Sequence, residues 1–136
     1  MDLMLSLKIA ASGLRAQSGR MRVIAENLAN SASTATTPGG DPYRRRVPTF
    51  ETEIERESGV QLIKPGRILA DRSQFETRYQ PGHPAADERG YVKLPNVNPV
   101  IETADMREAQ RSYEANLNVV GATRRMLART LDILRS

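Results

Sequence analysis

The sequence predicts an α+β protein in which long N- and C-terminal helices pack as a coiled-coil-like pair, with a small, irregular, β-rich domain between them in the chain. All eight prolines and six of the nine glycines lie between Pro38 and Pro99, so both ends of the 136-residue chain are free of proline. Apolar residues at both ends recur at alternating steps of three and four, which is typical of helices that pack along one stripe. We therefore expect an N-terminal helix over 1–30, a strap and middle domain over 31–99, and a C-terminal helix over 100–136.

The N-terminal helix is predicted from a heptad seam. Its members are Leu3, Leu7, Ala10, Leu14, Gln17, Met21, Ile24 and Leu28. A second line consists of three small residues, Ser12, Ala16 and Gly19. A glycine costs about 1 kcal/mol in a helix relative to alanine, and it is tolerated where another backbone must approach closely. We infer a helix pair that needs more neighbours than its own chain provides.

The first helix runs into two asparagines, Asn27 and Asn30, and is followed by a polar tract over 31–37 that ends at Pro38-Gly39-Gly40. Asparagine accepts the left-handed conformation that ends helices, and its side chain forms local turns. This explains a stop at Asn30, but it explains less well an asparagine at position 27, inside the helix. We interpret the tract as a flexible strap and the glycine pair as a hinge.

The middle of the chain carries strand and turn signals. The sequence Lys64-Pro65-Gly66-Arg67 fits a type II turn with a positive φ at its glycine. Short strands are predicted on both sides of this turn, at 60–63 and 68–70. A further strand is predicted over 75–79, and residues 49–55 alternate weakly. The segments 80–84 and 94–99 are predicted loops because they combine proline with glycine or asparagine.

The C-terminal helix is predicted to begin after Pro99, with an entry near Thr103, and to carry a second heptad seam. The apolar members of that seam are Met106, Tyr113, Leu117, Val120, Leu127, Leu131 and Leu134, with Gln110 and Arg124 as polar interruptions. Each terminal helix carries an apolar stripe, and the middle segment is too short to cover both. Part of the apolar surface of the helices is therefore expected to remain uncovered. We expect such arms to be frayed in isolation, because helices owe most of their stability to tertiary packing.

Composition argues against several classes of protein. The chain has no cysteine, which excludes disulfides, thiolate metal sites and a cysteine nucleophile. No stretch approaches the ~20 apolar residues of a membrane span, and Asp2 and Lys8 do not fit a secretory signal. The single histidine, His83, lies in a Pro-Gly loop without a recognisable catalytic partner. We therefore expect no enzymatic activity, no catalytic residues, no metal and no cofactor.

A nucleic-acid or anionic-surface binding module is the alternative function. The run Arg44-Arg45-Arg46 is a small basic patch, and Lys8, Arg15 and Arg22 recur every seven residues. However, the net charge is only +4, and acidic residues lie close to the arginines in sequence, at Asp41 and within 51–57. We favour a salt-bridged surface, or a contact with an acidic neighbour, and expect no nucleic-acid partner.

Several stretches together resemble a known family. Residues 12–30, SGLRAQSGRMRVIAENLAN, are similar to the N-terminal signature shared by flagellar rod, hook and hook-associated proteins. The later stretches GGDPYRRR (39–46), YQPGHPAADERGYVKLPNVNPVIE (79–102) and MREAQRSYEANLNVV (106–120) resemble, in order and at about the family's length, the rod proteins of the flagellar basal body. The first signature marks the axial superfamily, and the segment 81–98 points to the rod.

The resemblance implies a bacterial structural protein without enzymatic activity, which assembles helically through its terminal helices into the proximal part of the rod, the drive-shaft tube of the flagellum. It implies copies of the same chain and the rod proteins FlgB, FlgF, FlgG and FliE as partners. It also implies export in an unfolded state by the flagellar type III apparatus, without a cleaved signal peptide, to the periplasmic rod. The clean stop of the first helix would then mark the boundary between an inner layer of helices and an outer layer.

On this basis we predict an assembly interface on the two terminal helices and at the end of the first one. From the N-terminal helix it comprises Leu3, Leu7, Leu14, Met21, Ile24, Asn27, Leu28 and Asn30. From the C-terminal helix it comprises Met106, Tyr113, Leu117, Val120, Leu127 and Leu131. We expect the leucine seams of the two helices to meet and the asparagines to orient the boundary.

Overall fold

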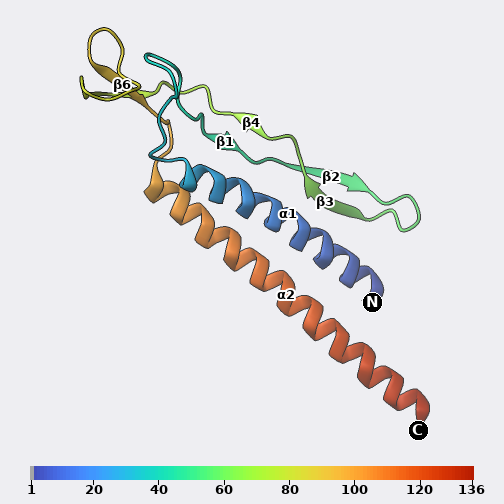
Figure 1. Cartoon of the computed structure of the whole chain (residues 1–136). Coiled ribbons are helices and arrows are strands. Elements are labelled where there is room, and N and C mark those ends of the chain that lie inside the picture. Colours follow the sequence, from blue (N-terminus) through green and yellow to red (C-terminus); the bar gives the residue numbers. More distant parts are fainter. Residues whose placement is uncertain (1) are drawn as a thin grey trace. The chain divides into compact units, whose positions relative to one another are not determined.

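The computed structural model describes residues 2–136 and confirms the predicted α+β class, with a long helix at each end and short strands between them (Figure 1). The helices are α1 (Leu3–Ala29) and α2 (Pro99–Arg135). The strands are β1 (Arg46–Val47), β2 (Phe50–Ile54), β3 (Gln61–Pro65), β4 (Leu69–Ala70), β5 (Glu76–Tyr79) and β6 (Tyr91–Leu94).

The chain divides into two compact units, and each helix contributes to both of them. Unit 1 contains the chain up to Met21, together with Thr49–Arg67 and Arg107–Ser136. Unit 2 contains Arg22–Pro48 and Ile68–Met106. Each unit is described separately below.

Both helices begin at side-chain caps. The Asp2 carboxylate accepts hydrogen bonds from the backbone N–H groups of Met4 and Leu5, at 3.0 and 3.2 Å. The Asn98 side chain accepts one from Val100 N–H at 3.0 Å, and Pro99 occupies the first helical position. Both arrangements satisfy N–H groups that a helix end leaves free. The helix α2 therefore begins at Pro99, four residues before the entry predicted near Thr103.

The end of α1 is set by local hydrogen bonds. The Asn30 side chain donates to the Glu26 carbonyl at 2.9 Å, and the Ser31 hydroxyl donates to the Leu28 carbonyl at the same distance. Within residues 2–136, no residue other than glycine has a positive φ. The stop predicted at Asn30 is confirmed, because α1 ends at Ala29, but the Asn30 side-chain amide makes it by satisfying a terminal carbonyl and not by a left-handed backbone.

In unit 1, β2 and β3 form an antiparallel hairpin in which Phe50 pairs with Pro65 and Ile54 with Gln61. The hairpin loop covers 55–60, where Gly59 has a φ of 70° and Glu55 N–H donates to the Val60 carbonyl. The predicted type II turn at 64–67 is wrong. Gly66 lacks a positive φ, and its N–H donates instead to the Thr49 carbonyl at 2.7 Å, so the chain stays beside its partner for one residue after β3 ends.

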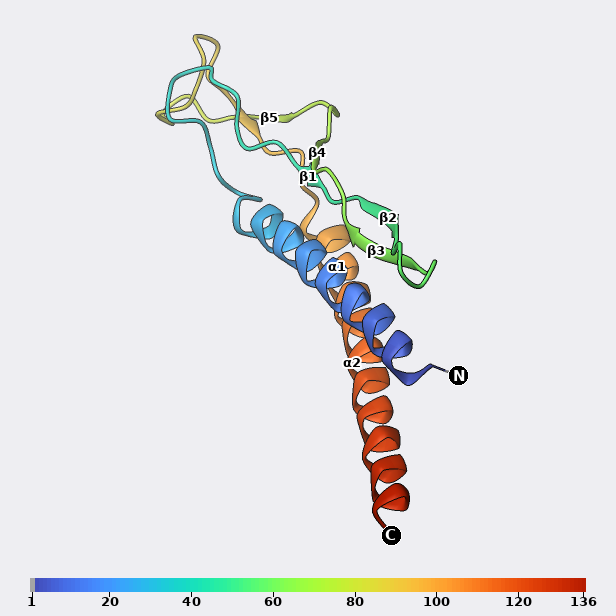
Figure 2. The ribbon, with the colours of Figure 1, turned by 90° about the vertical axis from the view of Figure 1, so that its right-hand side faces the viewer.

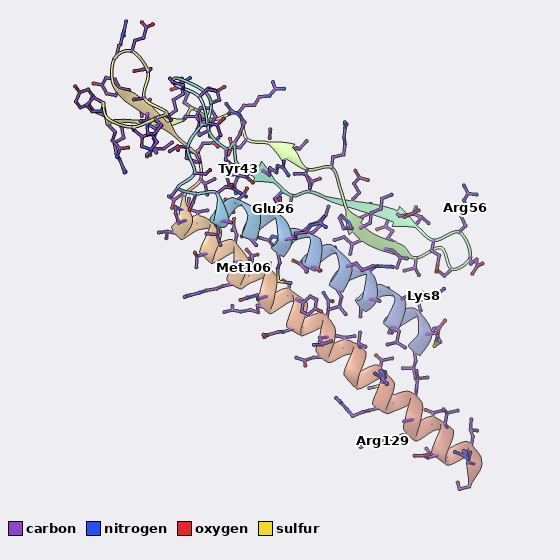
Figure 3. The ribbon with its side chains drawn as sticks, viewed as in Figure 1. Lys8, Glu26, Tyr43, Arg56, Met106 and Arg129 are labelled. Carbon is purple, nitrogen blue, oxygen red and sulfur yellow. The ribbon has the colours of Figure 1, made fainter. Side chains whose placement is uncertain are left out.

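The hairpin lies along α1 (Figure 2). A Cβ atom added to Gly19 would lie 3.3 Å from a ring carbon of Pro65, and the Lys8 ammonium pairs with the Glu55 carboxylate at 3.0 Å (Figure 3). The small residues Ser12 and Ala16, on the same side of α1, are buried. The predicted close approach to the small-residue line therefore occurs, and the neighbour is a hairpin of the same chain.

The two helices of unit 1 pack antiparallel. A Cβ atom added to Gly13 would lie 2.7 Å from the side-chain nitrogen of Asn116 on α2. Further along, the Arg20 guanidinium and the Glu108 carboxylate are 3.4 Å apart. A step of seven residues forward on α1 thus corresponds to eight residues back on α2.

In unit 2, β1 pairs with β4 and β5 pairs with β6, both antiparallel. The strand predicted over 75–79 is confirmed as β5, whereas the predicted strand at 68–70 pairs with β1 and not across the 64–67 turn. The loop between β5 and β6 is closed by a hydrogen bond from Gln80 N–H to the Gly90 carbonyl at 2.8 Å. Tyr79 and Tyr91 meet edge to face at this end of the strands, with ring centroids 5.3 Å apart.

Two glycines with the same backbone conformation allow a matched test of packing. Gly90 has a φ of 84°, and an added Cβ would lie 2.9 Å from the Tyr79 ring and 3.0 Å from Pro81. Gly59 has a φ of 70° with nothing within 4 Å of an added Cβ. Gly59→Ala should lower the free energy of unfolding by about 1 kcal/mol, and Gly90→Ala by about 2–4 kcal/mol because a steric clash adds to the φ penalty. Urea unfolding of the two variants measures both; equal losses would contradict the packing argument.

Candidate assembly surface

The predicted interface residues fall into three groups by exposure. Ile24 and Asn27 are buried within the chain, at 2% and 0% exposed. Leu117 and Leu131 are exposed, at 50% and 59%. The other ten are half-buried: Leu3, Leu7, Leu14, Met21, Leu28, Asn30, Met106, Tyr113, Val120 and Leu127.

The half-buried leucines of unit 1 lie on the side of α1 that the hairpin leaves uncovered. Gly19 and Lys8 face the hairpin. At 3.6 residues per turn, Leu7 and Leu14 lie roughly 120–140° around the helix from Gly19. They therefore turn toward α2 and the open side of the pair, which accounts for their partial exposure.

Leu117 contributes to the same open side. Gly13 and Asn116 face each other across the helix pair. In an antiparallel pair of right-handed helices, the residue that follows each facing residue turns to the same side, so Leu14 and Leu117 lie on one surface. The two predicted leucine seams thus flank a shared face and do not interdigitate at its centre.

The C-terminal end of α2 extends past the N-terminal end of α1 (Figure 1). Because Gly13 lies opposite Asn116, the first residue of α1, Leu3, is level with about Met126. The last nine residues of α2, roughly 13 Å of helix, therefore lie beyond α1. Large apolar side chains in this region are strongly exposed, namely Leu131, Ile133 and Leu134.

In unit 2, Asn27 is the centre of a buried polar cluster. Its side-chain oxygen accepts hydrogen bonds from the Tyr43 hydroxyl at 2.8 Å and from Arg46 N–H at 3.0 Å (Figure 3). Its side-chain nitrogen donates to the Arg46 carbonyl at 2.8 Å and to the Glu102 carboxylate at 3.2 Å. The asparagine inside the helix thus ties α1 to strand β1 and to the first turns of α2.

Glu102 and Arg45 complete the polar cluster. The Glu102 side chain is 1% exposed and forms an ion pair with the Arg45 guanidinium, which also lies 3.5 Å from Asp71 and 3.8 Å from Asp105. Burial opposes the charged form of Arg45, yet its pKa is raised, because hydrogen bonding and attraction to Glu102 outweigh the burial. Asn96 accepts a hydrogen bond from Arg45 N–H at 2.7 Å and donates to the Asp71 and Ser73 carbonyls.

Sequence reasoning placed Asn27 and Asn30 at this boundary but missed Glu102, Arg45 and Tyr43. The spacing of Glu102 in the sequence was a usable signal. Glu102, Ala109, Asn116 and Thr123 follow one another at intervals of seven residues. These residues form one heptad column, and it is this column that faces α1.

The three consecutive arginines are largely engaged within unit 2. Arg44 donates to the Asp71 carbonyl at 2.8 Å and stacks on the Phe75 ring, 4.2 Å from its centroid. Arg45 lies in the ion-pair cluster described above, and Arg46 is 3.4 Å from the Glu26 carboxylate. The salt-bridged surface that we favoured over a phosphate-binding patch is therefore what the structure contains.

His83 stabilises its own loop. The Nδ1 atom of its imidazole accepts a hydrogen bond from Ala85 N–H at 3.0 Å. The backbone N–H of His83 donates to the Gln80 carbonyl. Among residues 2–136, no group of three or more histidines and carboxylates has the geometry of a metal site. No helix within that range is long and apolar enough to cross a membrane.

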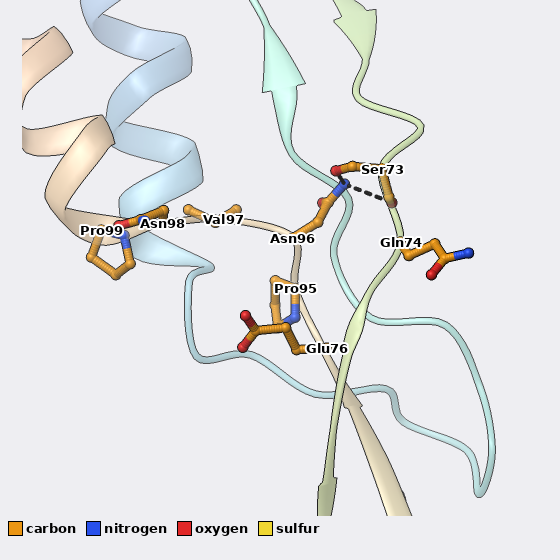
Figure 4. A pocket seen from close by; sticks show the side chains of 8 residues that line it. All are labelled: Ser73, Gln74, Glu76, Pro95, Asn96, Val97, Asn98 and Pro99. Carbon is orange, nitrogen blue, oxygen red and sulfur yellow. Dashed lines mark hydrogen bonds between the residues drawn. The ribbon is translucent and has the colours of Figure 1, made fainter.

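A hollow of about 390 Å³ opens beside the polar cluster (Figure 4). It is lined by Ser73, Gln74, Glu76, Pro95, Asn96, Val97, Asn98 and Pro99. Asn96 and Asn98, its principal amides, already have partners, because Asn96 bonds the 71–73 segment and Asn98 caps α2. We interpret the hollow as a consequence of these structural hydrogen bonds.

The polar cluster should make the free energy of unfolding fall at acid pH. The Ser73 N–H holds the pKa of Asp71 below its ordinary value of 3.8, and the charge of Arg45 acts in the same direction. A lowered folded-state pKa contributes stability above the unfolded-state pKa, and this is lost as the pH falls through the folded-state pKa. Asp71→Asn should therefore lower stability at pH 7 and flatten its decline below about pH 4. Thermal unfolding between pH 7 and pH 2 tests this, with the exposed loop variant Glu57→Gln as a control that should retain the full decline.

Comparison with known proteins identifies the family. A family model described as the C-terminal region of the flagellar basal body rod FlgEFG proteins matches residues 88–133. The chain is 54% identical to the flagellar basal-body rod protein FlgC of Agrobacterium fabrum, over 95% of this chain and 93% of that protein. The chain belongs to the FlgC family of flagellar basal-body rod proteins.

Two further FlgC proteins match the chain over nearly its full length. The chain is 42% identical to FlgC of Aquifex aeolicus over 97% of both proteins, and 38% identical to FlgC of Salmonella typhimurium over 92% of both. As a FlgC family member it is a structural subunit of the flagellar basal-body rod, and its family assembles with other rod components. These relatives carry the names of rod proteins and not of enzymes, and they give no support to the nucleic-acid alternative.

Proposed function

We propose that this chain forms part of the proximal rod and assembles helically through its terminal helices. The observation that carries the proposal is the uncovered side of the helix pair in unit 1, where half-buried leucines of α1 lie beside the exposed Leu117 of α2. A repeated contact between unlike surfaces generates an open helical array unless the rotation closes. A tubular rod is such an array.

The proposed partners are copies of this chain and the rod proteins FlgB, FlgF, FlgG and FliE. We place the assembled subunit in the periplasmic part of the basal body, reached by type III export of the unfolded chain without a cleaved signal peptide. The exposed apolar end of α2 supports assembly with neighbours, because such surface is costly in a free molecule. We propose no catalytic role.

In-cell photocrosslinking tests the assembly surface. A photoreactive phenylalanine analogue at position 117 should crosslink to rod proteins or to a second copy of the chain, identified by mass spectrometry of purified basal bodies. The same analogue at the neighbouring exposed residue Asn118, which is turned about 100° around α2 from Leu117 and points away from α1, is the matched control. Equal crosslinking at both positions, or none at position 117, would contradict the proposal.

A further inference from the structure

The line along which α1 and α2 face each other is made largely of polar and small residues, with the buried Ile24 among them on α1. On α2 it consists of a column of residues spaced by seven: Glu102, Ala109, Asn116 and Thr123. All are buried except Asn116, which is half-buried. On α1 the facing residues are Gly13, Arg20 and Asn27, also spaced by seven. Their contacts are with Asn116, Glu108 and Glu102 respectively.

The apolar residues flank this line and repeat with the same period. Leu7, Leu14 and Met21 on α1 are seven residues apart, as are Met106, Tyr113, Val120 and Leu127 on α2. Sliding one helix by seven residues exchanges one large apolar side chain for another. Apolar packing alone therefore permits several antiparallel registers of similar energy.

We propose that the contact between Asn27 and Glu102, held in place by Arg45, selects one register of the helix pair. A single polar residue on a helix seam is an established means of fixing register. Here Asn27 has four hydrogen bonds and Glu102 has an ion pair, and both side chains are at most 1% exposed. Because each helix is continuous, a register chosen at this contact extends along both helices.

The alternative registers break these bonds. One slip by seven residues brings Gly13 opposite Ala109. It places Glu102 opposite Arg20, and these two form an acceptable charge pair. However, it moves Asn27 beyond the start of α2 at Pro99. The opposite slip places Asn27 against Ala109 and moves Glu102 past the end of α1 at Ala29. Each slip leaves at least one buried polar group without its partner, which disfavours the slipped register.

Disulfide trapping reads the register directly, because the natural chain has no cysteine. Gly13→Cys is combined in turn with Asn116→Cys for the native register, and with Ala109→Cys or Thr123→Cys for the two slipped registers. In the otherwise natural chain, the native pair should oxidise at least about tenfold faster than either slipped pair, because a disulfide needs Cα atoms within about 7 Å. In the triple variant Asn27→Leu/Arg45→Leu/Glu102→Leu, the three rates should come within about threefold of one another.

A variant carrying Asn30→Leu and Glu114→Leu controls for added hydrophobicity, and it should keep the native preference because neither residue belongs to the cluster or to the facing line. Far-UV circular dichroism is recorded for every variant. A triple variant that keeps its helices and its tenfold preference overturns the proposal. A triple variant that loses its helices also overturns it, because the cluster would then stabilise the helices instead of selecting their register.

Discussion

Replacing Asn27 by leucine is expected to lower the free energy of unfolding by about 3–5 kcal/mol. Leucine has the same branching and the same number of side-chain heavy atoms, but it can neither accept from the Tyr43 hydroxyl nor donate to the Glu102 carboxylate. It would leave a buried carboxylate and a buried backbone pair at Arg46 short of partners. Guanidinium unfolding followed by far-UV circular dichroism measures the loss.

Asn30→Leu is the matched control, since it makes the same substitution three residues later. The Asn30 side chain donates one hydrogen bond, to the Glu26 carbonyl at the half-exposed end of the helix. We expect this variant to lose no more than about 1 kcal/mol. Similar losses at the two positions would show that the polar cluster contributes little beyond ordinary capping.

Leu117→Asp is expected to abolish incorporation into the rod and therefore motility, while leaving the free subunit folded. Leu117 is half exposed in the isolated chain, so a charge at this position meets water and not the core. In an assembled helix layer the same carboxylate would be enclosed without a partner, which costs several kcal/mol per subunit and is repeated in every copy. Swimming in soft agar and the amount of subunit in purified basal bodies measure the effect.

The control for this experiment is Asn118→Asp, which adds the same charge at the next residue of α2, about 100° around the helix from Leu117. It should swim normally and assemble at the natural level. The cellular amount of both variants must match that of the natural chain. Normal rods in the Leu117→Asp strain would falsify the assignment of this face to assembly.

Local pattern was sufficient to predict the helices and the strands at 60–63, 68–70 and 75–79, which correspond to β3, β4 and β5. The heptad seams define α1 and α2 to within a few residues, and the alternation over 75–79 defines β5. The predicted helix over 100–136 begins one residue after the observed start of α2, and the suggested entry near Thr103 lies four residues inside the helix, although Asn98-Pro99 carries a cap followed by a proline at the first helical position. Here the local signal was present and a weaker one was preferred.

The strand pairing and the polar cluster depended on contacts between distant residues. Pro65-Gly66 resembles a turn locally, but the long-range bond from Gly66 to Thr49 keeps the chain beside its partner instead. Glu102 meets Arg45, 57 residues away in the sequence. Glu102 is buried because its face of α2 packs on α1. The sequence analysis instead placed the leucine seams, and not the polar column, at the centre of the contact between the two helices.

The unequal lengths of the two helices have a practical consequence. With 27 residues in α1 and 37 in α2, folding of one molecule leaves leucine and isoleucine side chains at its C-terminal tip in contact with water. Concentrated preparations of the purified chain should thus cluster or precipitate through this tip. Dilution, mild detergent or removal of the final turns should keep the molecule dispersed and suitable for spectroscopy.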